Sequence, residues 1–269
     1  MQNKVDLYNT AYDNFAKEVE RQVRAETYGE DLGQTGWMTA AEFRQFLGFL
    51  ELKRGAHILE VGFGAGGCAL YAADATGVQV TGIDINENGV RNARELAESK
   101  GLGARVRFNR MDASRPLPFP ESSFDAIFSN DAICHLDGRP AVLKEWYRVL
   151  APGGRLLFSD AMILTGILTS DELTVRSSIG HYLFLPMGEN ERLIREAGFT
   201  LLRADDLTAS SETISRKWHD TRERHHEDLI RIEGETNFRG LQNFLSCVHL
   251  ISKERRLSRY AYLAQKAFA

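Results

Sequence analysis

The 269-residue sequence contains only three cysteines, Cys68, Cys134 and Cys247, an odd number spaced far apart. A disulfide framework or a zinc cluster needs paired or closely spaced cysteines, so this set favours neither. We therefore expect reduced, mostly buried thiols and a reducing compartment, the cytoplasm.

Long apolar runs are also missing. No segment reaches the ~20 apolar residues of a membrane-spanning helix, and the first residues lack the apolar centre and cleavage site of a secretory signal. The net charge is only −4, so the chain as a whole does not attract a polyanion. We expect neither a membrane nor a nucleic acid as partner, but a small molecule, and a homo-oligomer stays open.

What is present is a globular composition, 43% hydrophobic and 26% charged, in which short apolar runs alternate with helical stretches. The expected strands are 57–61, 79–83, 105–110, 124–129, 155–160, 199–207 and 259–268. The expected helices between them include 66–75, 87–100, 139–150 and 189–197. Such alternation predicts βαβ units and a parallel sheet.

Three segments flank this alternating core. Thr39 and Glu42 have capping-box spacing, which predicts a helix that begins there. Segment 161–186 follows an expected strand end and is predicted to be part of a substrate lid. Polar helices at about 210–254 form an insertion longer than a compact connection needs, which we expect to cover the site or to make a dimer contact.

The most informative motif is Ile58-Leu-Glu-Val-Gly-Phe-Gly-Ala-Gly-Gly67, in which an apolar strand enters a glycine turn and then a helix. Glycines let the backbone approach a ligand closely. Asp84 closes the next strand, where a carboxylate suits ribose hydroxyls. Because the turn also satisfies G-x-G-x-x-G, the glycines alone leave a nicotinamide dinucleotide open as the ligand.

Three further features separate these readings: Glu60 stands two residues before the first glycine, Asp112 follows the third strand, and Leu150-Ala-Pro-Gly-Gly-Arg155 precedes the fifth. In this combination, residues 55–160 resemble the class I S-adenosylmethionine-dependent methyltransferase family. Phe63 departs from that pattern, because the family often has a small residue or Cys there. The resemblance implies a Rossmann-like, doubly wound α/β fold with seven strands, the last antiparallel, plus N-terminal helices and a helical cap.

The resemblance also implies how the chain is divided and which residues hold S-adenosylmethionine. Residues 1–54 would be an N-terminal helical cover, 55–160 the cofactor-binding core, and 161–269 the rest of the sheet with the lid and insertion. Glu60 and the glycines would hold the methionine end, Asp84 the ribose, and Asp112 the adenine. The full predicted cofactor set is Glu60, Gly62, Gly64, Gly66, Asp84, Ile85, Asp112, Ala113 and Asn130.

Residues 128–137, after the fourth strand, look like small-molecule N-methyltransferases that act on phosphoethanolamine, sarcosine or glycine. The similarity is closest at Asp131 and His135. It implies that Asp131 binds a cationic or hydroxyl group of the acceptor and that His135 accepts a proton or orients the acceptor. A purely structural His135, hydrogen-bonded within its loop, stays open.

Three aromatic residues are candidates for the substrate pocket or lid: Tyr28, Trp37 and Tyr182. An aromatic face there suits a sulfonium by cation–π attraction, and core packing is the competing explanation. The His-containing run 218–226 lacks a ligand spacing, so we expect no metal.

The sequence thus predicts a methyltransferase that uses S-adenosylmethionine to methylate nitrogen or oxygen of a small molecule, or carbon of a natural-product intermediate. A nicotinamide-dependent oxidoreductase and a non-catalytic cofactor-binding protein are the alternatives. The oxidoreductase offers no role for Glu60.

Overall fold

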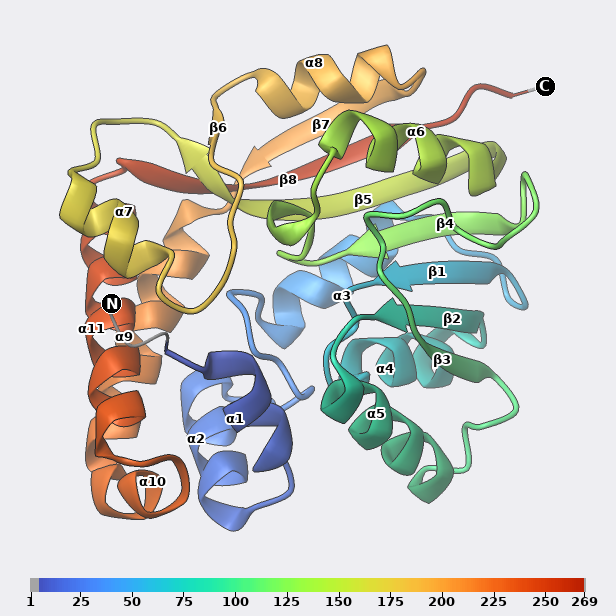
Figure 1. Ribbon diagram of the computed structural model, residues 1–269. Coiled ribbons are helices and arrows are strands. Elements are labelled where there is room, and N and C mark those ends of the chain that lie inside the picture. Colours follow the sequence, from blue (N-terminus) through green and yellow to red (C-terminus); the bar gives the residue numbers. More distant parts are fainter. Residues whose placement is uncertain (1–4, 269) are drawn as a thin grey trace.

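The computed structural model describes residues 5–268 and has three layers, with helices on both faces of one central sheet (Figure 1). The sheet has eight strands in the order β3-β2-β1-β4-β5-β8-β7, with β6 paired to β5 off this path. Strands β1 to β5 are parallel, and β8 is antiparallel to β5 and β7. The strands are β1 (His57–Val61), β2 (Gln79–Asp84), β3 (Val106–Arg110), β4 (Phe124–Ser129), β5 (Leu150–Leu164), β6 (Leu185–Pro186), β7 (Thr200–Asp206) and β8 (Leu257–Gln265).

The helices form the two covering layers and a separate group at one end of the sheet. They are α1 (Leu7–Asp13), α2 (Glu18–Tyr28), α3 (Ala40–Phe49), α4 (Gly67–Thr76), α5 (Glu87–Ser99), the 3-10 turn η1 (Ile133–His135), α6 (Arg139–Val149), α7 (Ser170–Arg176), α8 (Glu189–Glu196), α9 (Thr208–Arg224), α10 (His226–Glu233) and α11 (Glu235–Lys253). Thr39 caps α3 as predicted, because its hydroxyl accepts from the Glu42 N–H at 3.2 Å.

Successive residues of a strand contribute to two hydrophobic cores, one on each face of the sheet. Ile58 of β1 packs with α3, α4 and α5, whereas the next residue, Leu59, packs with α6 and α8. A third cluster joins α1 and α2 to α9 and α11 through residues such as Val23, Trp218 and Phe244. Figure 1 shows this group at one end of the sheet.

The predicted doubly wound sheet with an antiparallel last strand is confirmed, with three differences, of which the first is an eighth strand, the two-residue β6. Strand β5 begins at Leu150, which pairs with Phe124, so Pro152-Gly153-Gly154 lies inside the strand rather than before it. It also runs on to Leu164, so the expected lid begins in the sheet. Residues 156–163 are all buried, which explains why no period of two marks them.

The remainder of the expected lid carries α7 and the two-residue strand β6. The insertion forms α9, α10 and α11, which pack on α2 and α7. All three cysteines are free thiols. Within residues 5–268, no helix is long and apolar enough to cross a membrane.

Candidate active site

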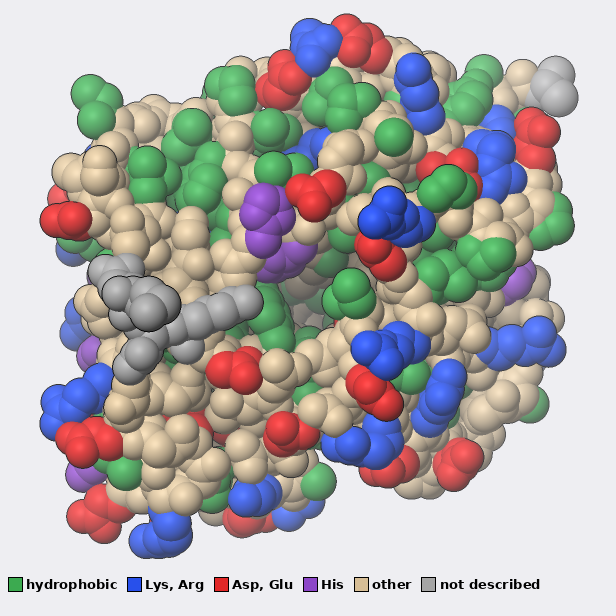
Figure 2. Space-filling view, in the orientation of Figure 1, with side chains coloured by type: hydrophobic (Ala, Val, Ile, Leu, Met, Phe, Trp, Pro, Cys, Tyr) green, Lys and Arg blue, Asp and Glu red, His purple; other side chains and the backbone are tan. Residues whose placement is uncertain are grey.

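A cavity of about 650 Å³ lies at the carboxyl ends of the parallel strands. Loops after β1, β2, β3 and β4 line it on one side, and α1, α7, α9 and α11 supply the other. Figure 2 shows a hollow near the middle of this face, with histidine side chains on its rim. In a doubly wound sheet this crevice is where ligands bind.

Most of the predicted cofactor residues meet in one half of this cavity. Residues Glu60, Gly62, Gly64, Asp84, Ile85, Asp112, Ala113 and Asn130 all line it. Asp84 ties the turn together, because its carboxylate accepts from the N–H groups of Gly64 and Asn86, each at 2.8 Å. Burial raises the pKa of Asp84.

Two predicted site residues lie outside the cavity lining. Gly66 is the left-handed N-cap of α4, and a Cβ there would come within 2.6 Å of the Ala93 Cβ, so its role is packing. Tyr28 is buried in the third hydrophobic cluster, which joins α1 and α2 to α9 and α11, and its hydroxyl donates to the Gly36 carbonyl at 2.8 Å. Its ring supports the segment before Trp37, which does line the cavity.

The glycine turn also accommodates the N-terminal cover. A Cβ on Gly67 would lie 1.6 Å from the Leu32 carbonyl oxygen, and one on Gly64 would lie 2.7 Å from the Tyr12 hydroxyl. Residues 32–38 therefore cross directly over the turn and close the cavity from that side. This is a second reason for glycine, besides approach to a ligand.

Glu60 is a buried carboxylate that faces the cavity with only 4% of its surface exposed. Burial and the nearby Asp84 raise the pKa of Glu60 to about 8, and no hydrogen bond opposes that shift. A cationic group in the cavity would compensate the Glu60 charge. The amino group and sulfonium of S-adenosylmethionine supply such charges, and Asp84 and Asp112 have free acceptor capacity for its hydroxyl and amino groups, so this half of the cavity fits the cofactor.

Asp131 lines the cavity, and its carboxylate also forms a buried ion pair. Its backbone is left-handed, with φ 50°, and its carboxylate accepts from Arg259 Nε at 2.9 and 3.0 Å. Arg259 is 0% exposed, and it also donates to Glu42 at 2.5 Å and to the Asn130 side-chain oxygen at 2.9 Å. The Asp131 charge is thus already paired, which fixes the loop rather than leaving the carboxylate free for an acceptor.

His135 is held at both ring nitrogens. Its Nδ1 lies 2.8 Å from the His181 carbonyl, and since a carbonyl only accepts, Nδ1 carries the hydrogen. Its Nε2 then accepts from the Tyr8 hydroxyl at 2.9 Å, and the Tyr182 hydroxyl lies 3.3 Å from that of Tyr8. Burial lowers the pKa of His135 to about 4, so the imidazole is neutral at pH 7.

Arg176, at the end of α7, is a buried cation that forms no ion pair with a carboxylate within residues 5–268. It is 2% exposed and lines the cavity, and its Nε and Nη1 have no hydrogen-bond partner. The ionisable groups that act on it most strongly are Tyr182, Cys134 and Tyr8, whose pKa values burial raises, so all are neutral at pH 7. Its guanidinium lies 4.5 Å from the centre of the Tyr182 ring. An anionic ligand would complete this site.

Aromatic rings form the rest of the second half of the cavity. Trp37 stacks on Phe244 with ring centres 6.3 Å apart and meets Trp218 edge-on at 6.3 Å. Tyr182 lies over His135 with ring centres 4.3 Å apart. The predicted roles of Trp37 and Tyr182 as pocket residues agree with this placement.

Tyr8, Arg176 and Phe244 line the cavity, and Arg259 lies behind Asp131. None of the four belongs to a local motif, so the sequence alone did not identify them.

Comparison with known proteins agrees with this geometry. Residues 59–158 match the family described as methyltransferase domain. Phosphoethanolamine N-methyltransferase 3 of Arabidopsis thaliana is 30% identical over 203 residues, which are 76% of this chain and 40% of that protein. The 27-O-demethylrifamycin SV methyltransferase of Amycolatopsis mediterranei is 33% identical over 164 residues, 60% of each protein.

Among solved structures, phosphoethanolamine N-methyltransferase 2 of Haemonchus contortus, in complex with phosphomonomethylethanolamine and S-adenosylhomocysteine, superposes with a TM-score of 0.81 at 21% identity. The match covers 98% of this chain and 61% of that one, and it shows the shared fold. The chain spans about two fifths of the first curated relatives, with coverage of 40% and 39%. The fold, the glycine turn with Glu60 and Asp84, and these matches together identify residues 59–158 as a methyltransferase domain of the S-adenosylmethionine-dependent type.

Proposed function

We propose that this protein transfers the methyl group of S-adenosylmethionine to a nitrogen of a small acceptor that also carries an anionic group, such as phosphoethanolamine. The observation that carries the proposal is Arg176, a buried guanidinium with two unpaired nitrogens in the cavity wall. A buried, uncompensated charge is costly unless a ligand pairs with it. The names of the relatives include both nitrogen and oxygen acceptors, and an anionic amine suits this cavity best.

The positions of the charged side chains indicate where the cofactor and the acceptor bind in the cavity. Glu60 and Asp84 line the half in which the cofactor fits, and Arg176 lines the half formed by α1, α7, α9 and α11. His135 and Tyr8 also line the cavity and are joined to Tyr182, over which Arg176 lies. An acceptor whose anion binds Arg176 would present its other end to the Tyr8 hydroxyl.

The proposed chemistry is a displacement at the methyl carbon. Bound S-adenosylmethionine supplies an electrophilic methyl group on a sulfonium. The acceptor nitrogen donates its N–H to the Tyr8 oxygen while the Tyr8 hydroxyl donates to His135 Nε2, so the relay directs the lone pair of the nitrogen toward the methyl group. Tyr8 and His135 would thus hold the nitrogen in line with the methyl group that the cofactor would supply. Tyr8, His135 and Arg176 also fix the approach of the nitrogen, which lowers the entropic part of the barrier.

The test is calorimetric titration of the protein loaded with S-adenosylhomocysteine, using phosphoethanolamine and ethanolamine in parallel. We expect phosphoethanolamine to bind about 100-fold more tightly, because a buried charged pair contributes about 3 kcal/mol. Arg176→Met should abolish that difference, and Arg176→Lys should restore part of it. Arg192→Met is the control, since Arg192 is half exposed and pairs with Glu189 and Glu196.

Equal affinity for the two ligands in the wild type would refute an anionic acceptor. Turnover with phosphoethanolamine, followed as S-adenosylhomocysteine formed, then tests the reaction itself. Binding of NADH in the calorimetric titration would contradict S-adenosylmethionine as the cofactor. Three free cysteines support a further proposal, that the protein acts in the cytoplasm.

A further inference from the structure

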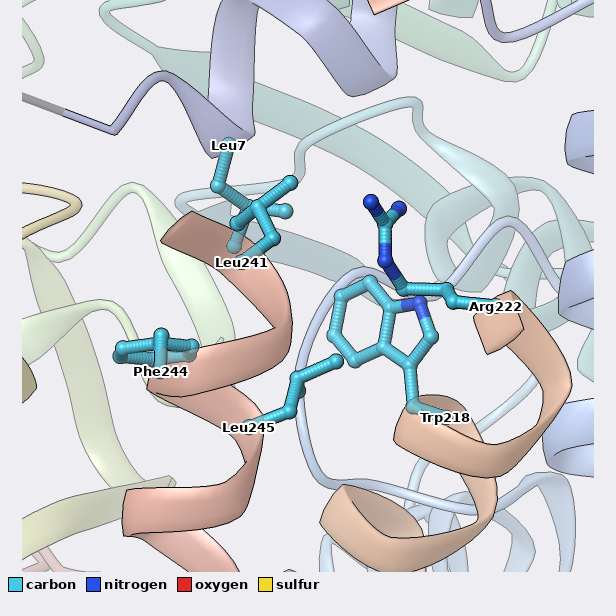
Figure 3. Close-up of a pocket in the computed structure, with 6 residues that line it drawn as sticks. All are labelled: Leu7, Trp218, Arg222, Leu241, Phe244 and Leu245. Atoms are coloured by element: carbon cyan, nitrogen blue, oxygen red, sulfur yellow. The ribbon is translucent and has the colours of Figure 1, made fainter. Parts of the chain in front are cut away.

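A second pocket lies between α1, α9 and α11, next to the active-site cavity. It is lined by Leu7, Trp218, Arg222, Leu241, Phe244 and Leu245. Figure 3 shows Trp218 and Arg222 projecting from α9, and Leu241, Phe244 and Leu245 from α11, with Leu7 above them. The space among them is too narrow for a water molecule. It is an apolar seam rather than an open site.

Three side chains belong to both linings: Leu7, Trp218 and Phe244 each face the cavity and the second pocket. They therefore form the wall between the two spaces. Beyond that wall lie Leu241 and Leu245, and the far side is closed by Arg222, which is paired with Glu233. The only obstacle between the cavity and this apolar seam is one layer of side chains.

Trp218 is the largest and best-held part of this wall. Its side chain is 7% exposed, its ring meets Trp37 edge-on, and it lies 6.3 Å from the Tyr28 ring at an interplanar angle of 55°. Phe244, in contrast, also supports the Arg176 guanidinium, which lies 5.2 Å from its ring centre. Removing Trp218 would open the wall without removing a contact to Arg176.

We propose that Trp218 limits the length of the acceptor. An alkyl chain on the anion at Arg176, separate from the chain that carries the nitrogen toward Tyr8, would run along Phe244 and meet the Trp218 ring. The wild-type site therefore takes short anionic acceptors and rejects those with an apolar tail. This inference rests on the proposed binding of an anion by Arg176, and one arm of its test does not depend on that binding.

The first arm measures the affinity of ethyl phosphate and n-hexyl phosphate for protein loaded with S-adenosylhomocysteine. We expect the wild type to prefer ethyl phosphate. In Trp218→Ala the preference should shift toward n-hexyl phosphate by at least about tenfold, because each buried methylene contributes roughly fourfold in affinity. Trp218→Phe keeps a ring in the wall and should behave like the wild type.

Phe238→Ala is the matched control. Phe238 is a buried ring of α11, and it lines neither pocket. It reports what a loosened cap does to affinity. Unchanged preference in Trp218→Ala, or an equal shift in Phe238→Ala, would overturn the proposal. If Trp218→Ala does not fold, Trp218→Leu takes its place.

The second arm uses indole, the ring that the substitution removes. Indole should raise the melting temperature of Trp218→Ala and leave those of the wild type and Phe238→Ala unchanged, since apolar cavities bind matching apolar molecules. If neither phosphate binds the wild type, the proposal of an anionic acceptor is refuted. The indole measurement alone then tests whether Trp218 forms the wall between the two spaces. No stabilisation of Trp218→Ala by indole would then refute the role of Trp218.

Discussion

Three buried charged side chains in and beside the cavity differ in their partners. Arg259 is enclosed by two carboxylates, those of Asp131 and Glu42, and by the Asn130 amide oxygen. Arg176 has two unpaired nitrogens, and the Glu60 carboxylate has no hydrogen bond that favours its charge. All three are less than 5% exposed, with 0%, 2% and 4% of their surface accessible.

This difference indicates that Arg259 is structural, whereas Glu60 and Arg176 bind ligands. Arg259 joins β8, α3 and the loop after β4, so its pairs hold the scaffold. Glu60, with its pKa raised to about 8, is mostly protonated at pH 7 and would ionise when a cationic cofactor binds, whereas Arg176 leaves a positive charge uncompensated, which fits an anionic acceptor. Substitution of each group distinguishes a charge that stabilises the fold from one that binds a ligand.

The largest effect is expected for Arg259→Met. It leaves Asp131 and Glu42 buried without their cation, and breaking a buried pair from one side costs about 3–5 kcal/mol. The free energy of unfolding from denaturant titration measures this. Arg203→Met is the control: the Arg203–Asp205 pair is exposed, so its loss should cost under about 1 kcal/mol. Equal losses would mean that Arg259 is not the structural charge.

Glu60 should make stability fall as pH rises. Its folded pKa of about 8 lies above the ordinary value of 4.5, so between these values the folded state binds more protons than the unfolded state. Stability is therefore lost through that window, by about 4 kcal/mol between pH 5 and pH 9, and Glu60→Gln should flatten the curve. Melting curves from pH 5 to pH 9 measure this.

The same group gives a binding signature. S-adenosylhomocysteine carries an ammonium group, which favours the ionised carboxylate, so its binding at pH 7 should release a proton from Glu60. Calorimetry in two buffers of different ionisation enthalpy detects that proton. Glu60→Gln should release none, and proton release that persists in Glu60→Gln would assign the effect to another group.

Arg176→Met should behave in the opposite way to Arg259→Met. It removes a lone buried cation, and we expect the apoprotein to gain about 1 kcal/mol, reduced by the lost contacts to the Tyr182 and Phe244 rings. The free energy of unfolding without ligand measures this gain. A loss comparable to that of Arg259→Met would show that Arg176 is structural.

The two halves of the cavity also differ in how far the sequence predicts them. Glu60, Asp84 and Asp112 follow successive strands of one βαβ series, and parallel strands bring their carboxyl ends together, so local motifs suffice. The extension of β5 to Leu164 was missed because a strand buried on both faces has no alternating pattern.

The acceptor half depends on packing between distant elements. Tyr8 of α1, His135 of η1 and Arg176 of α7 meet only after the insertion has packed against α1 and α2. The ion pair of Asp131 could not be predicted for the same reason, because its partner Arg259 lies at the other end of the chain. A motif identifies a residue type at a loop but not the charge that will face it.

Tyr8→Phe, which changes no charge, tests whether the acceptor half moves a proton or only positions the acceptor. We expect kcat with phosphoethanolamine to fall at least about tenfold at pH 7, with a smaller change in KM. Because alkylammonium groups have pKa values near about 10, the defect should shrink toward that pH if Tyr8 accepts the proton of the nitrogen. A pH-independent defect would indicate positioning alone. His135 should add no inflection between pH 5 and pH 8, since its pKa is about 4, and His135→Ala should reproduce the Tyr8→Phe profile if the two act as one unit.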